Sequence, residues 1–262
     1  MNPCIKEVQA FDGVTLYVAV DTVENSKGVV IVGHGAGSDL SLFQYANVAE
    51  KFNEAGFTTY RYDQRGHGKS GGERTYLESF KDLFADAKTI FDLAKAENPT
   101  QKIFFWGNSM GALAAAGFAI ENPGLCDGFM LAVTGVGLAP VDNHEHDRHE
   151  RFPLGGASMS AMVKSGDVKD FVPEITYGMQ YEMEAASQWV PEHCEAIQDP
   201  VFMVNGTEDR IISWRLCLEC FEKMSTKDKQ FNLYGGVSHV IYGSEIRDSV
   251  IARTVTWLNE RL

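Results

Sequence analysis

Basic side chains are scarce in this sequence. Its 262 residues include 23 Lys and Arg against 36 Asp and Glu, which gives a formal net charge of −13 at pH 7. An acidic surface repels the phosphates of nucleic acids and of anionic lipids. We therefore expect no nucleic-acid partner and no docking on an anionic membrane, and a strongly anionic ligand would need a local basic patch.

Long apolar runs are also missing. No window approaches the roughly 20 consecutive apolar residues of a membrane span. The segment Met1–Glu7 lacks the charged stretch followed by an apolar one that marks a signal peptide. The sequence therefore predicts a cytoplasmic protein with no stable membrane insertion. It carries no signal of oligomeric state and leaves a homodimer open.

Cysteines are few, and their number is odd. Cys4, Cys126, Cys194, Cys217 and Cys220 are scattered, which predicts free thiols in a reducing compartment rather than a disulfide framework. Cys217 and Cys220 form a C-x-x-C inside an expected helix, but no second Cys pair or His pair accompanies them. A zinc site is therefore disfavoured, and packing as small apolar side chains is the simpler interpretation.

Strand-like and helix-like segments alternate along most of the chain. The run 28–33 (GVVIVG) is typical of a strand buried on both faces. The other expected strands are 4–10, 14–20, 57–62, 103–106, 128–134, 201–205 and 231–234, and the expected helices are 42–55, 79–97, 110–121, 213–224 and 246–261. Residues 4–20 are expected to form a hairpin, and Ser79 and Asp82 to cap the second helix. This alternation predicts an α/β fold with a mostly parallel sheet covered by helices on both faces.

The alternation breaks between residues 138 and 196. This stretch holds no clear buried strand, and short helices are expected only near 158–165, 168–177 and 182–196. We therefore predict a core made of residues 1–137 and 197–262, with 138–196 inserted as a helical cap. Ligands of open α/β sheets bind beyond the carboxyl ends of the strands, where such a cap would cover them.

The predicted cap is rich in Met and aromatic side chains. Met159, Met162 and Trp189 are candidates for lining an apolar substrate pocket, because Met and aromatic residues adapt to apolar ligands. Packing of the cap onto the core explains the same residues equally well.

One motif in the chain carries chemistry. Gly107-Asn108-Ser109-Met110-Gly111 matches G-x-S-x-G, follows an expected strand and opens an expected Ala-rich helix. That setting is typical of a nucleophile elbow, in which a tight turn projects the serine hydroxyl from the sheet. The sequence therefore predicts Ser109 as a catalytic nucleophile.

A serine nucleophile needs a base, and the base needs an orienting acid. In folds with a nucleophile elbow the order along the chain is Ser, acid, His. Of seven histidines, only His239 follows the last two expected strands, and Asp209 follows the strand 201–205. We predict the triad Ser109, Asp209 and His239. Glu208 and Asp142 remain the alternative acids.

The tetrahedral intermediate of such chemistry needs backbone donors. The N–H of Met110, directly after the nucleophile, is one candidate. Ala36 is the other, because its loop follows the strand 28–33. His34, in the same loop, is expected to brace it rather than to catalyse. No cofactor is required.

A polar stretch holds three more histidines. His144, His146 and His149 alternate with acidic side chains, but no helix frames them to hold a metal ion. A solvated edge of the cap is the favoured interpretation, and no metal is expected.

Five blocks together resemble a known family. They are GHGAG (33–37), YDQRGHGKS (62–70), GNSMG (107–111), GTED (206–209) and SH (238–239). The sequence from about residue 28 to 262 is similar to the monoacylglycerol lipase and lysophospholipase-like α/β-hydrolases. This resemblance implies an α/β-hydrolase fold, a serine esterase with a cap, and the same triad and oxyanion donors. It implies structural roles for Asp63 and His67. The family usually has His where this chain has Asn108.

The favoured function is hydrolysis of carboxylic esters with medium-sized apolar acyl groups, through an acyl-enzyme. A hydroxycinnamoyl (feruloyl)-type esterase, a thioesterase and an amidase are alternatives that would use the same triad. A non-catalytic ligand receptor on the same fold is disfavoured, because a receptor needs no intact triad.

Overall fold

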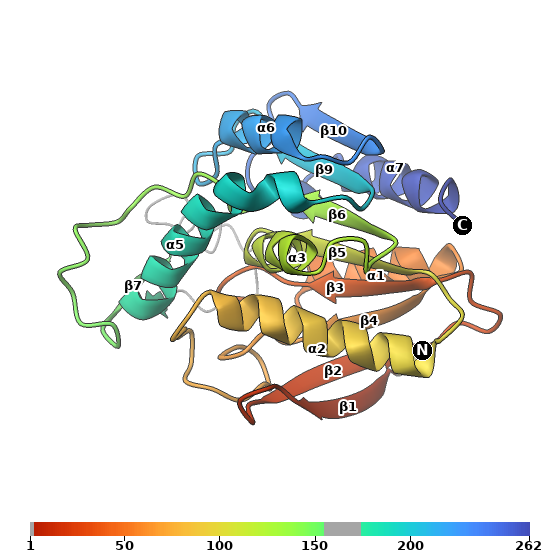
Figure 1. Ribbon diagram of the computed structural model, residues 1–262, viewed down its shortest axis with the longest axis horizontal. Helices are drawn as coiled ribbons and strands as arrows, with labels where there is room; N and C mark the ends of the chain where they lie inside the picture. Colours follow the sequence, from red (N-terminus) through yellow and green to blue (C-terminus); the bar gives the residue numbers. More distant parts are fainter. Residues whose placement is uncertain (1–2, 155–173) are drawn as a thin grey trace.

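The computed structural model describes residues 3–154 and 174–262, and its centre is a twisted sheet of eight strands (Figure 1). The strand order is β1-β2-β4-β3-β5-β6-β9-β10, and every pairing from β4 to β10 is parallel. The bounds are β1 Cys4–Gln9, β2 Thr15–Asp21, β3 Val29–Gly33, β4 Thr58–Tyr62, β5 Ile103–Asn108, β6 Gly128–Ala132, β9 Val201–Gly206 and β10 Lys229–Tyr234. The predicted α/β fold with a mostly parallel sheet is confirmed.

The antiparallel edge of the sheet is the expected hairpin. β1 pairs with β2 from Cys4 opposite Val20 to Gln9 opposite Thr15, and β2 continues antiparallel onto β4. The turn between the two strands contains Gly13 at a φ of 85°, in the left-handed region that favours glycine.

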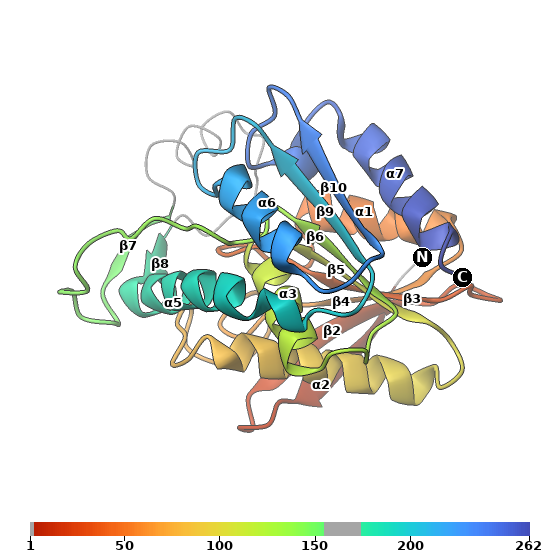
Figure 2. The same ribbon diagram turned by 45° about the horizontal axis from the view of Figure 1, so that its top comes forward.

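Helices cover both faces of the sheet. Their bounds are α1 Phe43–Glu54, α2 Lys81–Glu97, α3 Met110–Glu121, α5 Tyr177–His193, α6 Trp214–Lys223 and α7 Arg247–Asn259. On one face, side chains of α1 and α7 such as Phe52 and Trp257 pack on Val30 and Phe104. On the other face, α2, α3, α5 and α6 pack on alternate residues of the same strands (Figures 1 and 2). The successive residues of each central strand therefore face two separate cores, which explains its continuous apolar run.

The start of α2 differs from the expected cap. The helix begins at Lys81, whose N–H donates to Ser79 Oγ at 3.2 Å, so Ser79 lies one residue further out than predicted. The N–H of Phe80 donates to Glu182 Oε2 at 2.9 Å, and Glu182 belongs to α5. A carboxylate at a helix N-terminus complements the free N–H groups and the positive end of the dipole. The sequence-distant Glu182 therefore supplies part of this cap.

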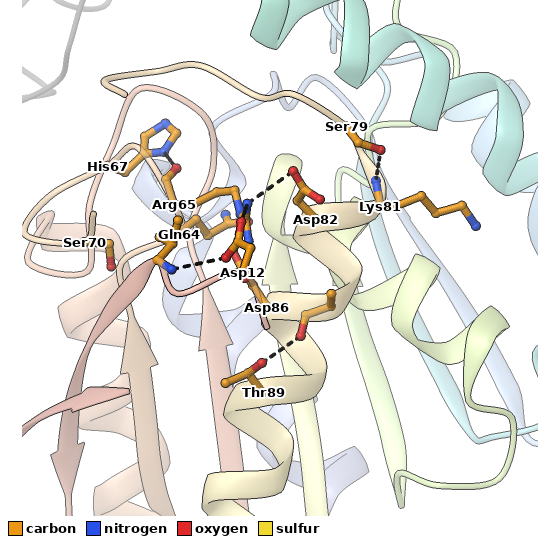
Figure 3. A network of polar contacts seen from close by, with 12 residues as sticks. Asp12, Gln64, Arg65, His67, Ser70, Ser79, Lys81, Asp82, Asp86 and Thr89 are labelled. Carbon is orange, nitrogen blue, oxygen red and sulfur yellow. Dashed lines mark hydrogen bonds and ion pairs between the residues drawn. The ribbon is translucent and has the colours of Figure 1, made fainter. Parts of the chain in front are cut away.

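Asp82 serves a different purpose from the predicted capping box. The guanidinium of Arg65 lies 3.2 Å from the Asp82 carboxylate, 2.7 Å from Asp86 and 2.9 Å from Asp12 (Figure 3). Asp86 is almost completely buried. Because one buried cation is shared by three carboxylates, Arg65 ties the loop after β4 to α2 and to the β1–β2 turn. His67 extends from the same loop.

The segment 138–196 contains two short strands that the sequence did not predict. β7 Arg151–Pro153 and β8 Glu174–Thr176 pair antiparallel, so residues 174–176 are extended rather than part of the helix expected over 168–177. The helix expected over 182–196 begins at Tyr177, and its last three residues form a 3₁₀ turn. The Thr176 hydroxyl accepts the N–H of Met179 at 3.1 Å and so caps the earlier start. The helix expected over 158–165, with Met159 and Met162, lies outside the described residues.

Among the helices that the structure describes, none combines the length and the apolar character that crossing a membrane requires.

Candidate active site

Ser109 lies on a strained turn between β5 and α3. Its φ of 54° and ψ of −114° are unusual for a residue with a side chain. Its N–H donates to Ala132 O of the neighbouring strand at 2.9 Å, which holds the turn in place. A Cβ on Gly107 would collide with the backbone of Gly111, and a Cβ on Gly111 with that of Gly33. Both glycines of the motif are therefore required for the close approach of helix and strands.

The structure brings His239 and Asp209 together with Ser109. His239 Nε2 lies 3.2 Å from Ser109 Oγ, and His239 Nδ1 lies 2.8 Å from Asp209 Oδ2. The Asp209 side chain is fully buried, and that of His239 is 12% exposed. The order of contacts is that of a nucleophile, a base and an orienting acid.

The loops that carry the acid and the histidine are bonded to each other. The N–H of Glu208 donates to Val237 O at 2.9 Å, and the N–H of Gly236 donates to Thr207 Oγ1 at 2.9 Å. These bonds join the ends of β9 and β10, which are adjacent parallel strands. The distance between Asp209 and His239 is therefore fixed by backbone contacts as well as by their own hydrogen bond.

The two oxygens of Asp209 have separate partners. Oδ1 accepts the N–H groups of Ile211 and Ile212, each at 2.9 Å, while Oδ2 faces His239. Burial alone would raise the pKa of this carboxyl, but the hydrogen bond and charge of His239 and the two N–H donors outweigh it. The pKa of Asp209 lies below its ordinary value, so the group is a carboxylate at neutral pH.

Neither alternative acid contacts His239. Glu208 is exposed beside Asp209. Asp142 accepts the hydroxyl of Tyr181 at 3.1 Å and the N–H of His144 at 2.6 Å, within the segment 138–196.

Two backbone N–H groups beside Ser109 have no acceptor among the described residues. In the loop after β3, the N–H of Gly35 donates to Tyr45 Oη at 2.9 Å and that of Gly37 to His67 Nε2 at 3.2 Å. The intervening Ala36 N–H makes no such bond, and neither does the N–H of Met110, the first residue of α3. A Cβ on Gly35 would lie 3.5 Å from Ser109 Cβ, so this loop passes directly beside the nucleophile. These are the two donors that the sequence analysis selected.

His34 and His67 hold the loop as neutral groups. His34 Nε2 accepts the N–H of Gln64 at 2.9 Å, and His67 Nδ1 lies 2.9 Å from Arg65 O. Burial lowers the pKa of both imidazoles, that of His67 to about 3. Asp63 accepts the N–H groups of Leu40 and Lys69, each at 2.8 Å. All three side chains thus make structural contacts in the loops beside the site.

A pocket of about 490 Å³ opens at Ser109. Its apolar lining from the core includes Leu42, Leu113, Ile211, Ile212 and Val240. The segment 138–196 contributes Leu138, Val141, Phe152, Leu154, Tyr177 and Met183. A pocket of this size and apolar character suits a small-molecule ligand. Figures 1 and 2 show α5 and β7 beside the end of the sheet at which β5 leads into α3.

Trp189 lies away from this pocket. Its ring packs against Phe80 and Phe84 of the α2 region, and the ammonium of Lys81 lies 3.8 Å from the ring centroid. Within the described part of the chain it is not among the residues that line the pocket. It points from α5 toward α2 and packs the two helices together.

Sequence reasoning missed most of the pocket lining. Phe152 comes from β7, a strand that the sequence did not predict, and its ring stacks on that of Tyr177 at 4.4 Å between ring centroids. Tyr45 was overlooked because its position resembles any buried helix residue. Only its place just after the β3 loop signals proximity to the site.

The three polar-stretch histidines pair separately. His144 faces Glu184 and stacks on Tyr181. His146 faces Glu150 and stacks on Tyr177. His149 faces Glu73 and stacks on Tyr76. No group of three or more His, Cys, Asp or Glu side chains is arranged to hold a metal ion in the ranges 3–154 and 174–262.

Comparisons with known proteins find similar sequences and similar structures. A curated monoacylglycerol lipase of Mycolicibacterium smegmatis is 24% identical over 259 residues, which cover 90% of this chain and 89% of the relative. A caffeoylshikimate esterase of Arabidopsis thaliana is 25% identical over 262 residues, which cover 90% of this chain and 79% of the relative. The crystal structure of a monoacylglycerol lipase of Paleococcus ferrophilus superposes on this structure with a TM-score of 0.80 at 22% identity. The match covers 94% of this chain and 99% of the lipase chain.

A family model decides the classification. The Hydrolase_4 model, described as serine aminopeptidase, S33, matches residues 24–150 and 160–245. The resemblance to monoacylglycerol lipase-like α/β-hydrolases that the sequence motifs indicated is confirmed. The matched residues include Ser109, Asp209 and His239, and the chain belongs to the Hydrolase_4 (serine aminopeptidase, S33) family of α/β-hydrolases.

Proposed function

We propose that this protein hydrolyses carboxylic esters through an acyl-enzyme on Ser109. The observation that carries the proposal is the continuous contact from Ser109 Oγ to His239 Nε2 at 3.2 Å and from His239 Nδ1 to Asp209 at 2.8 Å. A serine hydroxyl is a weak nucleophile until an adjacent base takes its proton. The strained backbone of Ser109 presents the hydroxyl to the pocket.

Acylation follows from these positions. His239 Nε2 accepts the Ser109 proton while Oγ attacks the ester carbonyl, and the ionised Asp209 stabilises the imidazolium that forms. The N–H groups of Ala36 and Met110 bind the oxyanion of the tetrahedral intermediate, with the N-terminal end of α3 behind Met110. The imidazolium then protonates the leaving alkoxide, which departs as the alcohol.

Deacylation repeats the same steps with water. His239 takes a proton from a water molecule as its oxygen attacks the acyl-enzyme carbonyl. Collapse of the second tetrahedral intermediate returns the proton to Ser109 Oγ and releases the carboxylic acid.

An ester with an apolar acyl group fits the pocket better than a peptide. An aminopeptidase has to bind a charged N-terminal ammonium, and a desolvated ammonium requires a carboxylate partner. No Asp or Glu is among the described residues that line the pocket. The relative from Mycolicibacterium smegmatis is named a monoacylglycerol lipase, which supports a medium-sized apolar acyl ester as substrate.

We also propose that residues 138–196 form a cap over the site. The support is that Leu138, Val141 and Met183 line the pocket with residues of the core, while Glu182 and Trp189 contact α2. The cap then determines which acyl groups enter, whereas the core determines the reaction.

A hydroxycinnamoyl ester is the second candidate substrate. Phe152 and Tyr177 stack beside the pocket and offer an aromatic surface to an aryl group. The relative from Arabidopsis thaliana is named a caffeoylshikimate esterase.

The test of the reaction uses purified protein and a series of p-nitrophenyl esters from acetyl to palmitoyl. We expect turnover with a preference for medium chains, and loss of turnover and of fluorophosphonate labelling in Ser109→Ala. Full activity of Ser109→Ala, or no turnover by the unaltered protein, contradicts the proposal. Rates on glyceryl esters against methyl ferulate then decide between the two substrate classes.

We further propose that the protein works in the cytoplasm, a reducing compartment. The support is that all five cysteines are free thiols and that four of them are buried. Mass spectrometry of the protein alkylated directly from cells tests this, because a disulfide in the native protein would contradict it.

A further inference from the structure

A buried hydroxyl lies between the two segments that carry the oxyanion donors. Tyr45 belongs to α1 and is 2% exposed, and its Oη reaches the loop after β3, beside Ser109. It accepts the N–H of Gly35 at 2.9 Å and an N–H of the Asn108 amide at 3.4 Å. Gly35 precedes one oxyanion donor, Ala36, and Asn108 lies two residues before the other, Met110.

The same hydroxyl is connected to the carbonyl of Gly35 through Ser38. Ser38 Oγ donates its only proton to Gly35 O at 2.6 Å. In the contact between Ser38 Oγ and Tyr45 Oη at 3.4 Å, the Tyr45 hydroxyl is therefore the donor. His34 Nδ1 lies 2.7 Å from the same carbonyl oxygen, with its Nε2 accepting from Gln64. The Gly35 carbonyl therefore has two donors on one side.

These contacts fix the direction of one oxyanion donor. The carbonyl of Gly35 and the N–H of Ala36 belong to one peptide group, which is planar and trans, so they point in opposite directions. With the carbonyl held by Ser38 and His34, the Ala36 N–H points away from them. The Gly35 N–H belongs to the preceding peptide group and is held by Tyr45, so the peptide groups on both sides of Gly35 are anchored.

We propose that Tyr45 is a positioning residue of the oxyanion hole, acting with Asn108 to hold the loop of Ala36 at a fixed distance from the turn of Ser109. This inference rests on the proposed ester hydrolysis. Oxyanion stabilisation depends on donors that are already in place when charge develops, and a small misplacement costs catalysis rather than binding.

Core packing alone would not need this hydroxyl. Tyr62 offers the comparison, because its ring is fully buried and its hydroxyl has no hydrogen-bond partner among the described residues. Burial raises the pKa of Tyr45 above its ordinary value, so its hydroxyl stays neutral and available as donor and acceptor.

The experiment compares Tyr45→Phe, Asn108→Ala and the double variant with Tyr62→Phe as the matched control. Steady-state kinetics on a p-nitrophenyl ester give kcat and KM across pH. Inhibition by an alkyl boronic acid, which forms a tetrahedral adduct on the serine, reports the oxyanion hole directly. Thermal unfolding of each variant reports stability separately.

We expect Tyr45→Phe to lower kcat about 10- to 100-fold with KM changed less than about twofold. Affinity for the boronic acid should fall by a similar factor, and the pH profile should keep its shape. Tyr62→Phe should keep its kcat. Asn108→Ala should lower kcat in the unaltered protein and change it less than about twofold in the Tyr45→Phe background, because both act through one hydroxyl.

Three results overturn the inference. They are a Tyr45→Phe variant with kcat within about threefold of the unaltered protein, a loss of kcat without loss of boronic acid affinity, and fully additive effects of the two substitutions. If Tyr45→Phe does not fold, Asn108→Ala and its boronic acid affinity decide alone. Failure of the proposed function is distinct, because it shows as an inactive unaltered protein.

Discussion

Replacing Asp209 by Asn changes one side of its side chain and leaves the other in place. Oδ1 accepts two backbone N–H groups, from Ile211 and Ile212, and an amide oxygen can keep both bonds. The amide NH₂ then takes the position of Oδ2, 2.8 Å from His239 Nδ1. Because NH₂ is a donor, it requires Nδ1 to be the unprotonated nitrogen, which places the imidazole proton on Nε2.

The magnitude follows from that tautomer. A protonated Nε2 cannot take the Ser109 proton across the 3.2 Å that separate them, so the base is lost while the site stays assembled. A substitution of this kind in a serine triad lowers kcat about 10⁴-fold. At 1.36 kcal/mol for each factor of ten, this corresponds to about 5.4 kcal/mol of transition-state stabilisation.

The assay is steady-state hydrolysis of p-nitrophenyl butyrate by Asp209→Asn, with Asp142→Asn as the control. Asp142 is one of the two alternative acids that the sequence offered, and its partners are Tyr181, His144 and His146, so its variant should keep kcat. Urea unfolding should show Asp209→Asn close to the unaltered protein in stability, because the Oδ1 bonds remain. An Asp209→Asn variant that retains about a tenth of the activity or more refutes the reasoning.

Three further predictions concern stability and substrate choice. Arg65→Met should lower the free energy of unfolding by about 3–5 kcal/mol in urea titrations, because it leaves the buried Asp86 carboxylate unpaired. A loss of less than about 1 kcal/mol contradicts this prediction. Because the pKa of His67 is about 3 in the fold and 6.5 ordinarily, only the unfolded chain binds its proton as pH falls below 6.5. Stability should therefore fall by about 2 kcal/mol at pH 5 through this residue, and His67→Asn should flatten the pH dependence measured by urea unfolding; an unchanged slope speaks against a neutral buried imidazole. Met183→Ala should raise KM for medium-chain esters several-fold in the acyl-chain series, because Met183 lines the pocket. Trp189→Phe should leave KM unchanged, because Trp189 packs on α2. Equal effects of the two substitutions would contradict this difference between a pocket residue and a packing residue.

The contact of Ser109, His239 and Asp209 could be predicted because its constraints are local or ordered along the chain. G-x-S-x-G needs glycine where Gly107 and Gly111 approach neighbouring backbone, and that steric demand is visible in five residues. Parallel strands deliver their carboxyl ends to one edge, so a residue such as Asp209 or His239 that follows a buried strand lies near the same site.

The pocket could not be predicted in the same way. Residues 174–176 are a strand because they pair with β7, a partner that no local propensity indicates. Asp82 fits a capping box by spacing, but the buried Arg65 offers its carboxylate a stronger interaction. Trp189 is of a residue type that often contacts ligands. Only the direction in which α5 crosses α2 turns its ring toward Phe84.

The sequence by itself determined the fold class and predicted Ser109, Asp209 and His239, which the structure brings into contact, because strand periodicity, turn sterics and chain order are properties of the chain. Tertiary structure alone decided which side chains line the pocket and how the Gly35–Ala36 peptide is oriented. The bonds that hold Gly35 come from Tyr45, Ser38 and His34, and Glu182 caps a helix about a hundred residues away. Such contacts depend on the packing of separate elements, for which no period or spacing in the sequence provides a signal.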